Sequence, residues 1–268
     1  MNPHRCGVID TGCPALLLAE SKSGEVRQYY VKIDSGTTYT TIAGIVRGPD
    51  IVGREWGFTV EGRLGRVAIL KPSPVELMEG FYERRTQVIY PKDLGFMLLV
   101  SGVTPRSRVL EAGVGSGFLT TALALVLCPE GQIIGLDLKR ENLEAVKRNL
   151  RMVGFDRCVR LMEGDVKSME LERLVGAVDA AFLDIPDPWE ALPSLSKVVK
   201  PGGSLTAFIP TSSQLDKLLK AITRDWLVQS AWETMARSMS MVEDAVRPSE
   251  WVANFTGYIV LLRRVIPG

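Results

Sequence analysis

A glycine-rich segment, EAGVGSG at residues 111–117, is the first part of this sequence that could hold a reactive ligand. It lies between an expected strand at 108–112 and an expected helix at 118–128. Glycine has no Cβ, so the backbone can approach a ligand closely and present the free N–H groups of a helix start. An ordinary tight turn between a strand and a helix has the same pattern, so the glycines alone are a weak signal.

Three acidic residues indicate which cofactor the turn would hold. Asp137 ends the next expected strand, about 20 residues on, where a carboxylate can accept both hydroxyls of a ribose. Asp165 follows the third expected strand, where the edge of an adenine would lie. Glu111 precedes the turn, where it would repel a pyrophosphate and suit the cationic methionine end of S-adenosylmethionine. A dinucleotide site also spaces its glycines differently, so the pattern favours S-adenosylmethionine.

Two further clusters, QVIYPKD at 87–93 and DIPDPW at 184–189, could form the side of the site that receives a methyl group. The second cluster follows an expected strand, and its two prolines fix the loop that carries Asp184. Trp189 could then wall the pocket, and Tyr90, beside a rigid proline, could face the acceptor. The alternative interpretation is a rigid turn with a capping aspartate and a packing tryptophan.

These three segments together resemble the tRNA (adenine-N1)-methyltransferase family, class I enzymes that act on adenosine 58 of the tRNA T loop. The resemblance runs over nearly the whole chain and includes Arg247-Pro248 and Thr256-Gly257-Tyr258. In archaeal members the neighbouring adenosine 57 can also be a target. The resemblance implies S-adenosylmethionine as cofactor, tRNA as partner, and a homotetramer that grips the tRNA across subunits.

The chemistry of this reaction suggests roles for the acceptor-side residues. N1 of adenine has a free lone pair, so its attack on a methyl group needs no prior deprotonation, and the product base is cationic. We expect Asp184 to accept a hydrogen bond from the N6 amine, which selects adenine, orients N1 and stabilises the developing charge. Tyr90 is the candidate stacking partner of the extruded base. Asp184 and Tyr90 are therefore the predicted catalytic residues, with Asp187 as the second choice for the carboxylate.

The other predicted site residues bind the cofactor or the RNA. The cofactor residues are Gln87, Glu111, Gly113, Gly115, Ser116, Gly117, Asp137, Leu138, Asp165, Val166 and Asp184 itself. Phosphate contacts need cationic side chains close together. The RNA-binding candidates are Arg84, Arg85, Trp189 and Arg247. The basic run at 147–151 is interpreted as an ordinary solvated helix face.

The late part of the chain departs from the family pattern. Family members commonly carry histidines and an arginine in this region, whereas this chain has RPSEW at 247–251 and Phe255 before Thr256. Any role of the missing side chains therefore cannot be carried over. Trp251 and Phe255 either stack on bases in their place or serve as packing residues.

Two alternative functions stay open at this level. One is a non-catalytic RNA-binding subunit with the same fold, against which the intact glycines, Asp137 and Asp184 argue. The other is a class I methyltransferase that acts on a protein or a small molecule. The joint presence of the clusters at 87–93 and 184–189 argues against that second alternative.

The elements that must position these residues fall into two parts. Residues 1–75 contain short β-prone runs separated by Gly, Asp and Pro, which predicts a small β-barrel-like domain. Residues 76–90 form a connector. Over residues 91–268 strands and helices alternate, which predicts an α/β methyltransferase domain with a doubly wound, seven-stranded sheet. The fifth strand is expected at 204–209, after the Pro-Gly-Gly segment at 201–203. The last two strands, expected near 231–237 and at 257–264, would form an antiparallel edge pair.

Composition limits the function further. The chain has 268 residues, 46% of them hydrophobic, which is enough for a substantial core. The formal net charge of +1 gives no strong global field, so any grip on RNA must be local. The only histidine is His4, which excludes histidine-based catalysis in the body of the chain, and no metal site is expected.

Cysteines and hydropathy suggest the compartment. Cys6, Cys13, Cys128 and Cys158 form no C-x-x-C pair, so neither a zinc site nor a disulfide framework is indicated. We expect buried or incidental thiols, and the alternative is an intersubunit or loop disulfide. No apolar run reaches about 18 residues, so no membrane span is expected and the cytoplasm is the predicted location. The excess of arginine over lysine suggests a thermophilic source.

Overall fold

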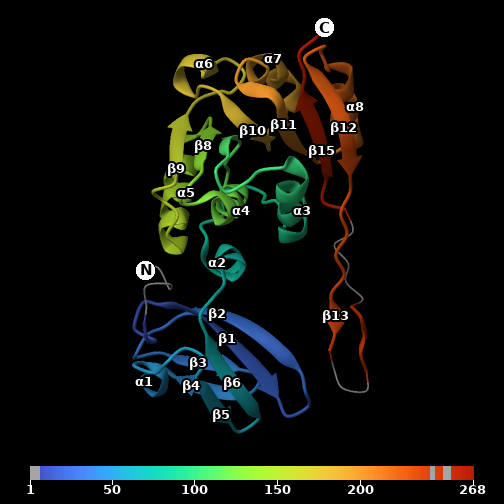
Figure 1. Cartoon of the computed structure of the whole chain (residues 1–268). Coiled ribbons are helices and arrows are strands. Elements are labelled where there is room, and N and C mark those ends of the chain that lie inside the picture. The colour runs from blue at the N-terminus through green and yellow to red at the C-terminus, as the bar shows by residue number, and fades with distance from the viewer. Residues whose placement is uncertain (1–6, 242–244, 250–254) are drawn as a thin grey trace. The chain divides into compact units, whose positions relative to one another are not determined.

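The computed structural model describes residues 7–241, 245–249 and 255–268, which form two compact units (Figure 1). The first unit takes in the chain up to Tyr82 together with 151–154 and 238–251, and the second contains 83–150, 155–237 and 252–268. The predicted connector at 76–90 contains the main boundary between them. The domain limits drawn from the sequence, at 75 and 91, stay a proposal.

The first unit is built on a four-stranded antiparallel sheet in the order β2-β1-β6-β5. Alternate residues of β1, Ala15, Leu17 and Ala19, are fully buried, because successive side chains of a strand point to opposite faces. The elements are β1 (Pro14–Ser21), β2 (Val26–Lys32), the hairpin β3 (Thr38–Thr41) and β4 (Gly44–Arg47), α1 (Gly48–Ile51), β5 (Thr59–Gly62), β6 (Gly65–Leu70), α2 (Pro74–Phe81), β13 (Met239–Ser240) and β14 (Arg247–Pro248). An N-terminal β domain is thereby confirmed.

The second unit contains a seven-stranded sheet in the order β12-β15-β11-β10-β7-β8-β9, counted over the described residues. β11, β10, β7, β8 and β9 are parallel, and β15 runs antiparallel between β11 and β12. The strands are β7 (Arg108–Ala112), β8 (Gln132–Asp137), β9 (Val159–Glu163), β10 (Val178–Leu183), β11 (Val199–Ile209), β12 (Trp226–Trp232) and β15 (Tyr258–Arg264). The doubly wound sheet predicted from the sequence is confirmed.

Helices cover both faces of this sheet, with α3, α4 and α5 on one side and α6, α7 and α8 on the other (Figure 1). They are α3 (Pro91–Ser101), α4 (Phe118–Leu127), α5 (Arg140–Val153), α6 (Leu171–Leu174), the 3-10 turn η2 (Pro188–Ala191), α7 (Leu192–Leu195) and α8 (Ser212–Lys220). Along the chain, the strands after β7 first extend the sheet to one side through β8 and then to the other through β10. The crevice at this reversal, above the carboxyl ends of β7 and β10, is where ligands bind in such sheets.

Two strand positions differ from the sequence prediction. β12 spans Trp226–Trp232, whereas we expected it near 231–237. Trp226, only 1% exposed, donates its indole N–H to the carbonyl of Leu192 at 3.2 Å and so anchors the strand earlier. β11 begins at Val199 and includes the Pro-Gly-Gly segment that we expected to precede it, with a register irregularity against β10.

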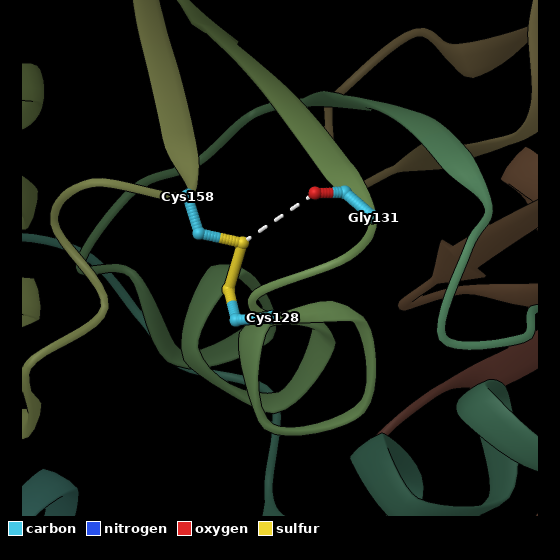
Figure 2. Close-up of a disulfide and its surroundings, with 3 residues drawn as sticks. All are labelled: Cys128, Gly131 and Cys158. Atoms are coloured by element: carbon cyan, nitrogen blue, oxygen red, sulfur yellow. Dashed lines mark hydrogen bonds between the residues drawn. A yellow bond between two sulfur atoms is a disulfide. The ribbon is translucent and has the colours of Figure 1, made fainter.

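The cysteine prediction was wrong, because Cys128 and Cys158 form a disulfide (Figure 2). Cys128 follows α4 and Cys158 precedes β9, and the packing of α4 beside β8 brings them together. The Cys158 sulfur lies 3.7 Å from the carbonyl oxygen of Gly131, to which it could donate a hydrogen bond only as a reduced thiol. Cys13 is fully buried and also disulfide-bonded, and Cys6 and His4 lie outside the described residues.

Within the described part of the chain, no helix is both long enough and apolar enough to span a bilayer.

Candidate active site

The glycine turn leads from β7 into α4 and can be built only with glycine. Gly113 and Gly115 have φ values of 89° and 52°, in the left-handed region that side chains disfavour. A Cβ on Gly113 would clash with the carbonyl oxygen of Asp184, and one on Gly115 would lie 2.6 Å from Thr86 Oγ1. The turn therefore packs directly against the loop after β10 and against the segment before α3. The third glycine, Gly117, is the N-cap of α4.

Asp137, the last residue of β8, is held beside this turn by three donors. Its Oδ2 accepts a hydrogen bond from the Gly115 amide at 3.0 Å, and its Oδ1 accepts from the Lys139 amide at 2.9 Å and from Asn142 Nδ2 at 3.0 Å. These contacts fix the orientation of the carboxylate before any ligand binds. Asn142 was missed by the sequence analysis, although its place in the first turn of the helix after Asp137 could have indicated it.

Two cavities meet at the carboxyl ends of the strands. The larger, about 390 Å³, is lined by Thr86, Ala112, Gly113, Leu136, Asp137, Leu138, Lys139, Asn142, Gly164, Asp165, Val166, Lys167, Asp184, Ile185, Pro186 and Asp187. The second, about 360 Å³, is lined by Thr86, Gln87, Gly113, Gly115, Asp137, Asp184, Ile185, Pro186, Pro210 and Gln214. Six residues line both cavities: Thr86, Gly113, Asp137, Asp184, Ile185 and Pro186. Asp184 and Asp137 are the two carboxylates among them.

Glu111, next to the last residue of β7, carries a buried carboxyl group, although it lines neither large cavity. It is fully buried in β7, Thr120 Oγ1 donates to its Oε1 at 3.0 Å, and its Oε2 has no hydrogen-bond partner among the described residues. Burial, with a smaller contribution from the negative charges of Asp184 and Asp137, raises the pKa of Glu111 to about 8. A cation bound nearby would favour the ionised form, so the site is suited to a positively charged ligand.

Asp184 is the second carboxyl group with a perturbed pKa. Its backbone amide donates to the Ala112 carbonyl at 3.0 Å, which fixes the start of the loop next to β7. Burial raises the pKa of Asp184 to about 6. The group is therefore mostly ionised at neutral pH and able to accept a hydrogen bond, in a position of low solvation where such a bond is strong.

The remaining predicted cofactor residues lie at different depths. Asp165 accepts a hydrogen bond from the Lys167 amide at 2.9 Å, Val166 is buried, and Leu138 is 65% exposed at the rim. Gln87 lines the second cavity. The Ser116 hydroxyl is already engaged within the protein, because it accepts hydrogen bonds from the Arg85 amide at 2.9 Å and from the Thr86 amide at 3.1 Å.

The predicted RNA-binding and stacking residues are less closely grouped. Tyr90, the N-cap of α3, is 43% exposed and does not line either large cavity. Arg84 lies over the Phe118 ring at 5.4 Å, and Arg85 pairs with Glu83 at 3.1 Å. These three residues all belong to the second unit.

Trp189 and Arg247 are also placed by the structure. Trp189 packs against the core of the second unit, with Lys217 Nζ 5.1 Å from its ring centre. Arg247 is exposed on β14 in the first unit, and Trp251 lies outside the described residues. The RNA roles of all these side chains stay predictions.

A buried ion pair at the start of α3 was missed by the sequence analysis. Lys92 Nζ donates to Asp93 Oδ1 at 2.9 Å and to Thr256 Oγ1 at 2.6 Å, and it also lies 2.9 Å from the Thr234 carbonyl. The Thr234 and Thr256 hydroxyls donate to the two Asp93 oxygens at 2.5 and 2.8 Å. This network joins the helix that follows Tyr90 to the segment after β12 and to the segment before β15. The local sequence contains no signal for the network, because the residues that contact one another lie more than 140 positions apart in the chain.

The arrangement of the sheet identifies a class of protein. An antiparallel strand inserted beside the last parallel strand, with a glycine turn and an acidic residue after the first two parallel strands, is the arrangement of class I methyltransferases. The fold and the site therefore define a class I methyltransferase.

The family follows from a comparison of sequences. The model of the family described as "tRNA methyltransferase complex GCD14 subunit" matches residues 65–256, and the chain belongs to this family. The catalytic subunit TRM61 of tRNA (adenine(58)-N(1))-methyltransferase from Eremothecium gossypii is 31% identical over 77% of this chain. The chain spans only 56% of that relative's length.

Two prokaryotic proteins match over nearly their full length. The tRNA (adenine(58)-N(1))-methyltransferase TrmI from Thermus thermophilus is 28% identical over 94% of this chain and 97% of its own. The crystal structure of tRNA (m1A58) methyltransferase TrmI from Aquifex aeolicus superposes with a TM-score of 0.85 at 24% identity, covering 97% of this chain and 100% of that one. The predicted family and fold are thereby confirmed.

Proposed function

We propose that this chain transfers a methyl group from S-adenosylmethionine to N1 of adenosine 58 in the T loop of tRNA. The observation that carries the proposal is the position of Asp184, which lines both cavities and has its pKa raised to about 6 by burial. The names of the relatives support the choice of adenosine 58. A relative from Methanocaldococcus jannaschii is named for adenine 57 as well as adenine 58, so adenosine 57 is the second candidate position.

The residues around the larger cavity fit S-adenosylmethionine, which a class I fold implies as methyl donor. Asp137, already oriented by three donors, would hold the ribose hydroxyls. The buried carboxyl group of Glu111, which does not line the cavity itself, would balance positive charge. Asp165 and Val166 would border the adenine. Gly113 lines both cavities and Gly115 lines the second, so a ligand can lie against the backbone of the glycine turn.

The chain's own residues would select and orient the acceptor. When bound, S-adenosylmethionine supplies a methyl group whose bond to the sulfonium sulfur breaks as the bond to N1 forms. Asp184 would accept a hydrogen bond from the adenine N6 amine, which excludes guanine because its six-position oxygen cannot donate. Its negative charge would also stabilise the positive charge that develops on the base. Tyr90 would stack on the extruded adenine.

Partners and location complete the proposal. tRNA is the proposed substrate. A net charge of +1 gives no strong attraction to RNA over the whole surface, and a homotetramer, implied by the family resemblance, would let several subunits contact one tRNA.

We keep the cytoplasm as the proposed location. Intracellular disulfides are a known feature of hyperthermophile proteins, so the Cys128–Cys158 bond is compatible with this location in a thermophile.

The test is direct. Incubation with labelled S-adenosylmethionine and tRNA, followed by digestion to nucleosides, should yield 1-methyladenosine, and a tRNA with guanosine at position 58 should not be labelled there. Asp184→Asn should lower the rate about 100-fold or more while cofactor binding persists. Asp216→Asn is the matched control, since it changes an exposed carboxylate on α8 that pairs with Lys220 and lines neither cavity. A normal rate in Asp184→Asn, or a labelled nucleoside other than 1-methyladenosine, would contradict the proposal.

A further inference from the structure

A third cavity, of about 360 Å³, lies at the opposite ends of the strands from the candidate active site. It is lined by Arg108, Gln132, Ile133, Ile134, Arg157, Cys158, Val159 and Arg160. Arg108 is the first residue of β7, whereas the active-site cavity reaches its last residue, Ala112. Arg108 and Ala112 are four residues apart in the strand, which corresponds to about 13 Å at the rise of a β-strand. The third cavity is therefore a separate site.

The charges around this cavity are all of one sign. Arg108, Arg157 and Arg160 line it, and no acidic side chain is present among the described residues that do so. One acidic residue, Asp179, is hydrogen-bonded to the backbone of Arg108. Its carboxylate accepts from the Arg108 amide at 2.8 Å and from Lys200 Nζ at 2.6 Å, so it already has two partners. Three guanidinium groups around one cavity repel one another unless an anion lies between them.

Arg108 also holds a donor that nothing in the described chain satisfies. Its Nη2 donates to the Val175 carbonyl at 2.5 Å, but its Nε is buried and has no hydrogen-bond partner among the described residues. Arg160 likewise donates one N–H to the Leu174 carbonyl at 3.3 Å. Buried donors are rarely left unpaired in folded proteins, so the orphaned Nε indicates an acceptor that is missing from the chain itself.

The wall of the cavity is held by a covalent bond. Cys158, which lines it between Arg157 and Arg160, is joined to Cys128 after α4 (Figure 2). This bond restricts the start of β9, an edge strand that pairs with β8 on one side. A fixed wall lowers the conformational entropy lost when a ligand binds.

We propose that this cavity is an anion site that binds a phosphate group through Arg108, Arg157 and Arg160. Guanidinium groups match the geometry of phosphate oxygens and can bind them in a bidentate manner. The phosphate can come from the RNA backbone or from a free phosphate-containing molecule. The site is independent of methyl transfer, so its test does not depend on the proposed function.

The first experiment uses inorganic pyrophosphate as the probe, with the full chain and isothermal titration calorimetry at low salt. The test variant is Arg157→Gln combined with Arg160→Gln. Both side chains are exposed, and circular dichroism checks that the double variant keeps the fold. Arg108 is avoided because its side chain is bonded to the Val175 carbonyl and its Nε is buried. Arg173→Gln is the control, since it removes an arginine on α6 that pairs with Glu170 outside the cavity.

The wild-type chain should bind pyrophosphate, and the double variant should bind it about 100-fold more weakly, roughly tenfold for each charged hydrogen-bond donor removed. The control should stay within about twofold. No measurable binding by the wild-type chain, or equal affinity in the double variant, would overturn the proposal.

A second experiment separates the two sources of phosphate. The salt dependence of tRNA binding is measured for the wild-type chain and the double variant. A slope of log K against log salt that falls by about one to two in the variant assigns the site to an RNA phosphate. An unchanged slope, with pyrophosphate binding lost, assigns it to a free phosphate-containing molecule.

Discussion

The buried carboxyl group of Glu111 should make the folded protein less stable as the pH rises, and Glu111→Gln should remove this dependence. The pKa of Glu111 is raised from an ordinary value of 4.5 to about 8. Between these two values the folded chain keeps a proton that the unfolded chain has lost. Because the unfolded state then binds fewer protons, the free energy of unfolding falls as the pH rises.

The size of the effect follows from the two pKa values. Between about pH 5 and about pH 8 the contribution of Glu111 to the free energy of unfolding should fall by about 3 to 4 kcal/mol, at about 1.4 kcal/mol per pH unit over most of the range. Above about pH 8 the group is ionised in both states, and the penalty levels off near about 5 kcal/mol. Glutamine keeps the shape of the side chain and cannot ionise.

The assay is denaturant unfolding of wild type and variant at both pH values, followed by circular dichroism. Other groups titrate in the same range, so the informative quantity is the difference between the two proteins. The advantage of Glu111→Gln over wild type should grow by about 3 to 4 kcal/mol from about pH 5 to about pH 8. Glu144→Gln, on the exposed face of α5, is the control and should show no such growth. An advantage that is the same at both pH values would refute the reasoning, because Glu111 would then be ionised throughout.

Three further predictions concern other parts of the second unit. Because the pKa of Asp184 is about 6 and its ionised form is the proposed acceptor, kcat should fall about tenfold per pH unit below about pH 6, and a flat profile would remove that role. Thr256→Val removes a donor to the buried Asp93 and should lower the free energy of unfolding by about 1 to 3 kcal/mol, whereas Thr256→Ser should keep most of that stability. An equal loss of stability in both variants would implicate packing and not the hydrogen bond. Cys128→Ser opens a loop with a sequence separation of 30 and should cost roughly 3 to 4 kcal/mol, seen as a lower melting temperature under oxidising conditions and no difference after full reduction.

The order of elements and the place of the main site residues could be predicted from the sequence. The glycine turn, Asp137 and Asp184 each lie at the end of a predicted strand, and the carboxyl ends of parallel strands lie at one edge of the sheet. The sequence therefore placed the turn and the two aspartates around one crevice, and Gly113, Asp137 and Asp184 line both cavities. The limits of β12 were less accessible, because the burial of Trp226 and not the local pattern sets where that strand begins.

Local sequence periodicity determined which segments become strands and helices, and the spacing of glycines and acids determined the cofactor edge of the sheet. Only the tertiary structure decided what meets across long separations: the Cys128–Cys158 bond, the Lys92 contacts with Thr234 and Thr256, and the cavity lined by three arginines. It also decided the protonation of Glu111, since burial sets that pKa. The physical reason is that hydrophobic patterning acts between near neighbours in sequence, whereas pairing and desolvation depend on which elements pack together.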